Sequence, residues 1–249
     1  MVTLTIHTRA ERPDLHAVLA GDPFAGSWPE FMQHDPTAWL YYSFLTEQAE
    51  HVLLALDDGQ PVAAAYSVGF AFPTEARPAL PDAGWDQVVR WAHMDRIKGV
   101  TPTACSALEI IIHPDRKGTG LSPVMLDALR RNAFRLGYDE LLAPVRPSAK
   151  AQQPHLPMAE YAALTRADDL PQDPWLRVHV RAGGEVVAIC PTSMTIPGTL
   201  EQWRTWTGLA FDLDGEQVVP GALSPVHVSL VQDYAVYVEP NVWVRHRRH

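Results

Sequence analysis

Hydrophobic residues along this chain recur with two different periods, and the order of those periods predicts a mixed α/β fold. Segments that alternate between apolar and polar residues, or are apolar throughout, are typical of strands, and segments with one apolar stripe are typical of helices. The expected strands span residues 2–8, 51–56, 61–72, 107–113, 140–145, 185–190, 226–231 and 234–238. The expected helices span residues 12–19, 28–48, 85–97, 121–136, 158–165, 174–182 and 200–207.

Two connections fix the directions of the central strands. Asp57-Asp58-Gly59-Gln60 separates the second and third strands and is typical of a hairpin turn, so those strands should be antiparallel. The strand at 107–113 is followed by a helix and another strand, and such a unit joins parallel strands. The expected fold class is therefore α/β with a mixed, twisted sheet.

The most informative segment follows the apolar strand that ends at Ile112. A polar turn leads into Lys117-Gly118-Thr119-Gly120, and the amphipathic helix at 121–136 begins directly after it. Glycines let backbone amides approach a ligand closely, and a helix N-terminus adds partial positive charge. This combination predicts a site for a phosphate or pyrophosphate.

The glycine spacing distinguishes between the known phosphate loops. Three glycines of the dinucleotide pattern and the Gly-Lys-Ser/Thr ending of the P-loop are both absent. Residues 117–122 instead resemble the acyl-CoA pyrophosphate loop of the GNAT (general N-acetyltransferase) superfamily, Arg/Gln-x-x-Gly-x-Gly/Ala. That loop follows a strand ending in Val-x-Pro, which Ile112-His113-Pro114 matches. Lys117 replaces the usual Arg or Gln, and Ser122 replaces the usual Gly or Ala.

The resemblance implies a GNAT-like acyl-CoA N-acyltransferase fold over residues 1–249, with acetyl-CoA or another acyl-CoA as co-substrate. Relative to the family, the chain carries a helical insert at 73–104, an insertion at 146–173 and an extended C-terminal region at 191–249. It is similar to a group of larger bacterial members of unassigned substrate. The residues that the resemblance assigns to CoA binding are Ile110, Ile111, Ile112, Lys117, Gly118, Thr119, Gly120, Leu121 and Ser122.

A family tyrosine that protonates the departing CoA thiolate has no direct counterpart in this chain. Aligning Gly183 with the family glycine puts His179 at the tyrosine position and Gly184 at a phenylalanine position. His179 could serve as the acid, because a histidine pKa lies near neutral, or it could be an ordinary packed helix residue. Tyr161 in the insertion is the alternative acid.

Glu109 is the candidate base, because it is the only acid in the apolar strand next to the expected CoA contacts. Desolvation there would raise its pKa and suit it to remove a proton from an ammonium group. The alternative is a glutamate on the solvated face of the strand. Aromatic residues that could form an acceptor pocket, or simply core, are Trp28, Phe31, Trp39, Tyr41, Tyr42 and Phe44.

The amino-acid composition limits the kinds of binding partner and location that can be expected. A net charge of −9 with no basic stripe argues against nucleic acid, and the Arg- and His-rich end at 245–249 is interpreted as a solvated tail. No apolar run reaches the length of a membrane span and no signal sequence is seen, so a cytoplasmic protein is expected. Cys105 and Cys190 are too few for a disulfide framework, and histidine spacing predicts no metal site.

The predicted function is transfer of an acyl group, most simply acetyl, from CoA to a primary amine of a small molecule. One alternative is a non-catalytic or sensory module that binds acyl-CoA. A second is aminoacyl-tRNA-dependent transfer on the same fold, which the acidic charge disfavours. Exposed edge strands also make a homodimer plausible.

Overall fold

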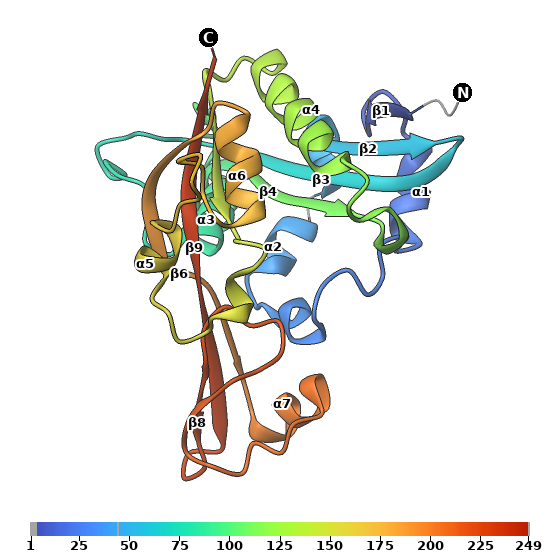
Figure 1. The fold of residues 1–249 in the computed structure, drawn as a ribbon. Coiled ribbons are helices and arrows are strands. Elements are labelled where there is room, and N and C mark those ends of the chain that lie inside the picture. The colour runs from blue at the N-terminus through green and yellow to red at the C-terminus, as the bar shows by residue number, and fades with distance from the viewer. Residues whose placement is uncertain (1–3, 44, 249) are drawn as a thin grey trace.

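A computed structural model describes residues 4–43 and 45–248, and its core is one mixed sheet with the strand order β1-β2-β3-β4-β5-β9-β8-β7 (Figure 1). β6 also pairs with β9, outside that path. The strands are β1 (Leu4–Thr8), β2 (Val52–Asp57), β3 (Gln60–Phe70), β4 (Ala104–Ile112), β5 (Glu140–Val145), β6 (Glu185–Gly198), β7 (Gly215–Gln217), β8 (Val226–Ser229) and β9 (Tyr234–Arg247). β4 and β5 are parallel, and the other pairs are antiparallel. The expected mixed α/β class is confirmed.

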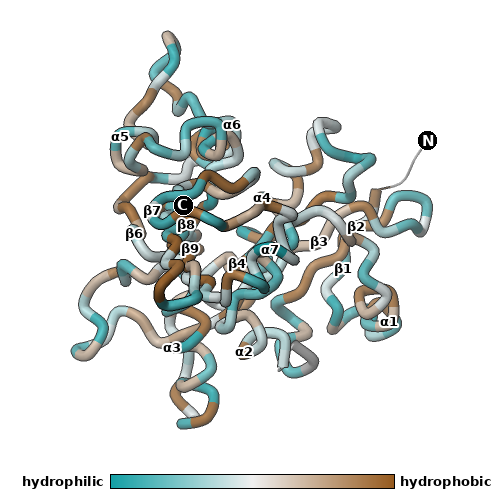
Figure 2. Tube along the Cα trace, turned by 90° about the horizontal axis from the view of Figure 1, so that it is seen from below, coloured by the Kyte–Doolittle hydropathy of each residue, from teal (hydrophilic) through white to brown (hydrophobic). Residues whose placement is uncertain are grey.

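Helices cover both faces of this sheet (Figure 1). They are α1 (Leu15–Ala20), α2 (Ala38–Tyr42), α3 (Gly84–Lys98), α4 (Leu121–Arg135), α5 (Met158–Ala162), α6 (Pro174–Arg181) and α7 (Leu200–Thr207). Successive side chains of a strand point to opposite faces. Val52 and Leu54 accordingly join the core under α1 to α3, whereas Leu53 and Ala55 join the core under α4 and α6. Figure 2, coloured by hydropathy, shows hydrophobic (brown) stretches along these central strands.

The parallel pair β4 and β5 separates almost as soon as it forms. Only Cys105 pairs with Leu141 and Ser106 with Leu142, so β4 has no partner strand on that edge from Ala107 onward. On its other edge, the register with β3 shifts between Tyr66 and Ser67, which leaves Leu108 as a bulge residue. The two strands therefore splay apart beside an unpaired stretch of backbone.

The C-terminal region projects beyond the central sheet. β6 and β9 are each 14 residues long, and their far ends carry β8 and α7 (Figure 1). The predicted end of the last strand at residue 238 is wrong, because β9 continues and pairs with both β5 and β6. Pro240 fits inside this strand because β6 is irregular opposite it, between Cys190 and Met194.

The segment at 28–48, predicted as one helical block, is not continuous. It forms a 3₁₀ helix at Glu30–His34, then α2, then a second 3₁₀ segment at Leu45–His51. Asp35-Pro36 separates the first two, because a residue before proline is disfavoured in a helix. Val2, Thr3 and Phe44 of the predicted elements lie outside the described residues.

The three predicted insertions remain interpretations, although each contains recognisable structure. Residues 73–104 carry α3 and 146–173 carry α5. Residues 191–249 carry the second half of β6 together with α7, β7, β8 and all of β9. No helix within the described ranges combines the length and apolar character needed to cross a bilayer. β1 and β7 are the end strands of the sheet path, and dimerisation through an edge stays a prediction.

A third core joins the C-terminal region to the segment before α2. Trp203 of α7 is fully buried and donates its indole N–H to the Ala235 carbonyl at 2.8 Å. Its ring lies 5.7 Å from the ring of Phe31. Phe31 thus belongs to the core and not to an acceptor pocket.

We expect Trp203→Ala to lower the free energy of unfolding by about 3–5 kcal/mol, because it empties the centre of this third core. Urea denaturation of the purified protein measures the change. Trp39→Ala is the control, since Trp39 is 62% exposed, and it should change stability by no more than about 0.5 kcal/mol. Equal effects of the two substitutions would contradict the packing described here.

Candidate active site

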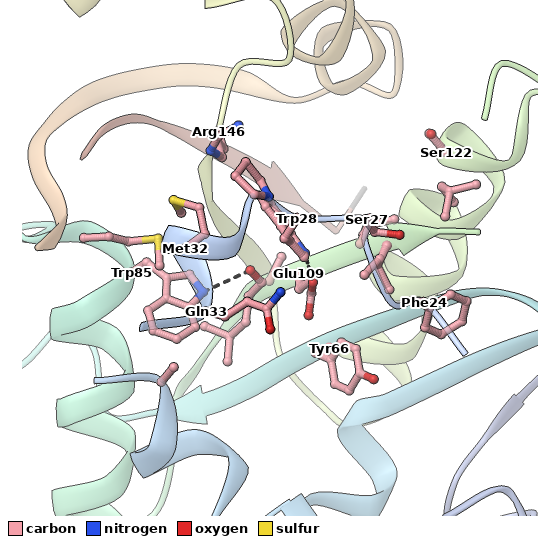
Figure 3. A pocket seen from close by; sticks show the side chains of 18 of the residues that line it. Phe24, Ser27, Trp28, Met32, Gln33, Tyr66, Trp85, Glu109, Ser122 and Arg146 are labelled. Carbon is pink, nitrogen blue, oxygen red and sulfur yellow. Dashed lines mark hydrogen bonds between the residues drawn. The ribbon is translucent and has the colours of Figure 1, made fainter. Parts of the chain in front are cut away.

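A cavity of about 870 Å³ opens where β4 and β5 splay apart. Its walls come from α1 and the segment after it, from β3 and β4, from the end of β5 and the middle of β9, from the starts of α3 and α4, and from α6. Figure 3 shows side chains from several of these elements converging on the same space. Segments that are distant in sequence therefore contribute to one site.

The predicted CoA-binding strand lies along this cavity. Ile110, Ile111 and Ile112 all line it, and they belong to the stretch of β4 without a partner strand on the β5 side. Backbone N–H and C=O groups on an unpaired edge are available to an extended ligand. This arrangement suits an extended arm that adds to the edge of β4.

The predicted pyrophosphate loop connects this strand to α4. Gly118 and Gly120 have φ values of 78° and 84°, which glycine adopts without strain. Lys117 and Ser122 line the cavity, and the Thr119 hydroxyl donates to the Arg116 carbonyl at 2.7 Å. Leu121 packs against the core beneath α4. Because the 15-residue helix α4 begins at the loop, its N-terminal amides suit an anionic ligand.

Glu109 is half-buried in the cavity wall and accepts a hydrogen bond on Oε1 from the Trp28 indole N–H. Burial raises the pKa of this carboxyl to about 6, and hydrogen bonds from Trp28 and Tyr42 oppose that rise. The nearby charge of Asp22 also favours a higher pKa. A carboxyl with a pKa near 6 is mostly ionised at neutral pH and is a stronger base than an ordinary glutamate.

Part of the predicted aromatic set surrounds this glutamate. Trp28 and Tyr42 line the cavity, joined by Phe24, Tyr66 and Trp85 (Figure 3 labels all of these but Tyr42). Tyr41 is buried in the core, and Trp39 is mostly exposed.

His179 also lines the cavity. It lies on α6, which Asp173 caps by accepting from the Trp175 and Leu176 amides at 2.9 and 3.0 Å. Burial holds the pKa of His179 well below its usual range, and neighbouring His246 and Arg130 add to that effect. The interpretation of His179 as an acid with a near-neutral pKa therefore changes. A neutral imidazole can donate a hydrogen bond to developing negative charge without acting as an imidazolium acid.

His246 does not line the cavity but supports His179 from behind, and sequence reasoning missed it. Its Nε2 lies 2.9 Å from His179 Nδ1, and burial lowers the pKa of His246 to about 4. The interpretation of residues 245–249 as a solvated tail is wrong for this residue, because β9 pairs with β5 and buries His246 completely. A Cβ at Gly184 would lie 2.6 Å from His246 Cε1, so the imidazole uses space that a side chain at 184 would take.

Tyr161, the alternative acid, is not among the residues that line this cavity. Its hydroxyl donates to Asp173 Oδ2 at 2.9 Å, and burial together with Asp173 raises its pKa. Asp173 is also the residue that caps α6. The geometry therefore gives Tyr161 a role in holding the helix that carries His179.

Arg146 and Glu239 also reach the cavity without having been predicted as site residues. Arg146 directly follows β5, and its Nε donates to Glu239 Oε2 on β9 at 2.8 Å. A charged residue at the end of a buried strand was the available signal. In the part of the chain that the structure describes, no three histidine, cysteine or acidic side chains gather as metal ligands would.

Comparison with known proteins identifies the family. No family model matches the chain. The chain is similar to arginine N-acetyltransferase avaD from Aspergillus versicolor, with 33% identity over 276 residues that cover 98% of this chain and 94% of the relative. Its fold is similar to the loading GNATL domain of CurA from Lyngbya majuscula, with a TM-score of 0.62 and 17% identity over 99% and 98% of the two chains. A GNAT-like decarboxylase, GphF in complex with isobutyryl-CoA, gives a TM-score of 0.52 at 18% identity over 98% of each chain.

The chain therefore belongs to the GNAT-type N-acetyltransferases. It is an enzyme of the acyltransferase class. The expected co-substrate, an acyl-CoA, is confirmed. This assignment disfavours the alternative of a non-catalytic acyl-CoA-binding module. The expectation of a bacterial group with unassigned substrate is not confirmed, because the relative comes from Aspergillus versicolor and is named for arginine.

We expect Trp28→Phe to raise the pKa of Glu109, because the indole N–H stabilises the ionised carboxylate. A base works only when it is deprotonated. As the pH is lowered, the variant should therefore lose activity at a higher pH than the wild type does. A hydrogen bond to a charged group is worth up to about 1.5–3 kcal/mol, which corresponds to a shift on the order of one pH unit. The acid limb of the pH profile of kcat/KM for the acceptor measures it.

Trp85→Phe is the matched control for this substitution. Trp85 lines the same cavity, but its indole N–H donates to the Leu108 carbonyl at 3.0 Å and not to a carboxylate. The acid limb of the pH profile of kcat/KM for Trp85→Phe should lie at the same pH as that of the wild type. A shift with Trp85→Phe but none with Trp28→Phe would remove the basis for the Glu109 assignment.

Proposed function

We propose that this enzyme transfers an acyl group, most simply acetyl, from acyl-CoA to the amino group of a small amino acid, with arginine as the first candidate. The observation that carries the proposal is the position of Glu109, where the unpaired edge of β4 meets the aromatic half of the cavity. The similarity to a relative named arginine N-acetyltransferase over nearly the whole of both chains supports the choice of acceptor.

In this proposal acyl-CoA binds on the side of α4. Backbone groups of Ile110 to Ile112 hold the extended arm of the co-substrate, and the loop from Lys117 to Ser122 holds its pyrophosphate. Positive φ at Gly118 and Gly120 keeps that loop close to the start of α4. The thioester then lies within the splay, between Glu109 and His179.

Glu109 takes a proton from the ammonium group of the acceptor and releases the neutral amine, which attacks the thioester carbonyl carbon. The tetrahedral adduct loses its second nitrogen proton to solvent, the carbonyl re-forms as the C–S bond breaks, and the CoA thiolate departs with the electron pair of that bond. His179 stays neutral and donates a hydrogen bond from Nε2 to the departing sulfur. The thiolate then takes its proton from solvent.

The α-amino group of arginine is the nitrogen that this site can activate. A guanidinium is far less acidic than an α-ammonium group and stays protonated in proteins, so a carboxylate with a pKa near 6 cannot deprotonate it. The guanidinium would instead remain charged. Asp22, Glu109 and the rings of Trp28, Tyr42 and Tyr66 form a wall of acidic and aromatic groups suited to cations.

We expect Gly120→Trp to weaken acetyl-CoA binding at least tenfold, or by about 1.4 kcal/mol, because the new side chain blocks the loop and strains its backbone. Calorimetric titration measures the affinity. Gly99→Trp is the matched control, since Gly99 also has a positive φ of 65°, is exposed and lies at the end of α3 outside the cavity. Equal acetyl-CoA affinity of the two variants would mean that CoA does not bind at the loop from Lys117 to Ser122.

Acceptor choice is tested by incubating the enzyme with acetyl-CoA and arginine, lysine, citrulline or agmatine while free thiol is measured. Arginine should give the highest kcat/KM, and mass spectrometry should place the acetyl group on its α-nitrogen. Citrulline should be poorer because it lacks the cation. Acetylation of the guanidine group, or turnover of every amine except arginine, would overturn the proposal.

A further inference from the structure

Arg146 connects the C-terminal region to the middle of the cavity. Its Nε donates to Glu239 Oε2 at 2.8 Å, and its Nη2 donates to the Gly221 carbonyl at 2.5 Å. Both partners belong to the region after residue 191. Glu239 is fully buried and also accepts from the Tyr237 hydroxyl and the Asn241 amide, so this end of the link is rigidly held.

The other side of Arg146 faces Trp28. The guanidinium carbon lies 5.6 Å from the centre of the Trp28 ring, which is within the range of a cation–π contact. The indole N–H of the same ring donates to Glu109 (Figure 3). Trp28 is therefore held between a partly buried cation on its face and a carboxylate at its nitrogen.

The segment around Trp28 makes further contacts with the same C-terminal region. A Cβ at Gly221 would lie 2.9 Å from Pro29 Cγ, so the backbone at Gly221 lies close against the proline ring. Phe31 packs edge-on against Tyr237 at 5.4 Å, and His34 stacks on Trp206 at 4.1 Å. The C-terminal region thus supports residues 28–34 along their length.

We propose that Arg146 is a positioning residue, which orients the Trp28 indole toward Glu109 and thereby makes the C-terminal region a working part of the acceptor site. The inference deepens the proposed function, since it rests on Glu109 as the base. It assigns to the region after residue 191 a task beyond stability.

Loss of the Arg146 contact should free the Trp28 ring and weaken its hydrogen bond to Glu109. The ionised carboxylate would lose a donor, and its pKa would rise. The other titratable groups that face Glu109 are Asp22 and the tyrosines Tyr41, Tyr42 and Tyr66, while Arg9 lies beside Tyr66. None of these groups is altered by a substitution at position 146.

The test uses the full chain labelled with ¹⁵N-tryptophan, in which the Trp28 indole resonance is assigned by its loss in Trp28→Phe. In the wild type this resonance should titrate with the Glu109 carboxyl, with a midpoint near 6. Substituting Arg146 alone would leave the buried charge of Glu239 without its partner and could unfold the protein. The variant is therefore Arg146→Gln/Glu239→Gln, which removes both charges together.

We expect the midpoint in the double variant to move up by on the order of one pH unit, the size expected for a hydrogen bond to a charged group. Arg204→Gln is the control, because Arg204 donates to the Ala210 and Phe211 carbonyls in the C-terminal region and does not line the cavity. Its midpoint should not move. An unchanged midpoint in a folded double variant would overturn the role of Arg146.

The resonance reports on the link without any need for turnover. If no amine is acylated while the midpoint shifts as expected, the proposed function fails and the positioning of Trp28 stands. If arginine is acylated and the midpoint does not shift, the proposed function stands and the positioning role of Arg146 fails. Where both hold, the acid limb of kcat/KM should shift in the same direction in the double variant as in Trp28→Phe, with the acetyl-CoA affinity unchanged.

Discussion

The separation of two parallel strands is the constraint on which the rest of this structure depends. β4 and β5 share only two paired positions, so the backbone of β4 beyond Ser106 lacks a neighbour on one edge. Unpaired backbone groups are costly when buried and must find other partners. The cavity forms along this edge, and the glycine loop and the start of α4 lie at its far end. The proposed cofactor site, the proposed base and the proposed acceptor space all lie where the two strands diverge.

Burial acts on both proposed proton-handling groups, with opposite effects on their pKa values. It raises the pKa of Glu109 and lowers that of His179, because in each case the charged form loses hydration. Hydrogen bonds from Trp28 and Tyr42 offset part of the rise in the pKa of Glu109, which suits this residue to the proposed role of base. His179 has only another buried histidine beside its Nδ1 and stays neutral. The two sides of the cavity therefore suit proton removal and hydrogen-bond donation respectively.

Features encoded by neighbouring residues could be predicted from the sequence, and features that depend on strand register could not. The strand, glycine loop and helix at 104–135 needed only local periodicity and glycine placement. Glu109 was found because it interrupts an apolar strand. His246 was missed because its burial depends on pairing with Leu141, more than 100 residues away in the chain. The Arg146 partners Gly221 and Glu239 are likewise brought close only by the paths of β6 and β9. A helical residue such as Tyr161 gave no sign of which way it faced.

β9 distributes its side chains between the two faces of the sheet. Glu239, Asn241 and Trp243 lie on one face of the strand, with Trp243 in the core under α3. Val242, Val244 and His246 lie on the other face, toward α4 and α6. A strand has a side-chain period of two, so one inserted or deleted residue before position 242 would exchange the faces of everything that follows. An insertion in the turn at residues 230–233 leaves this register intact, whereas an insertion within the strand itself does not.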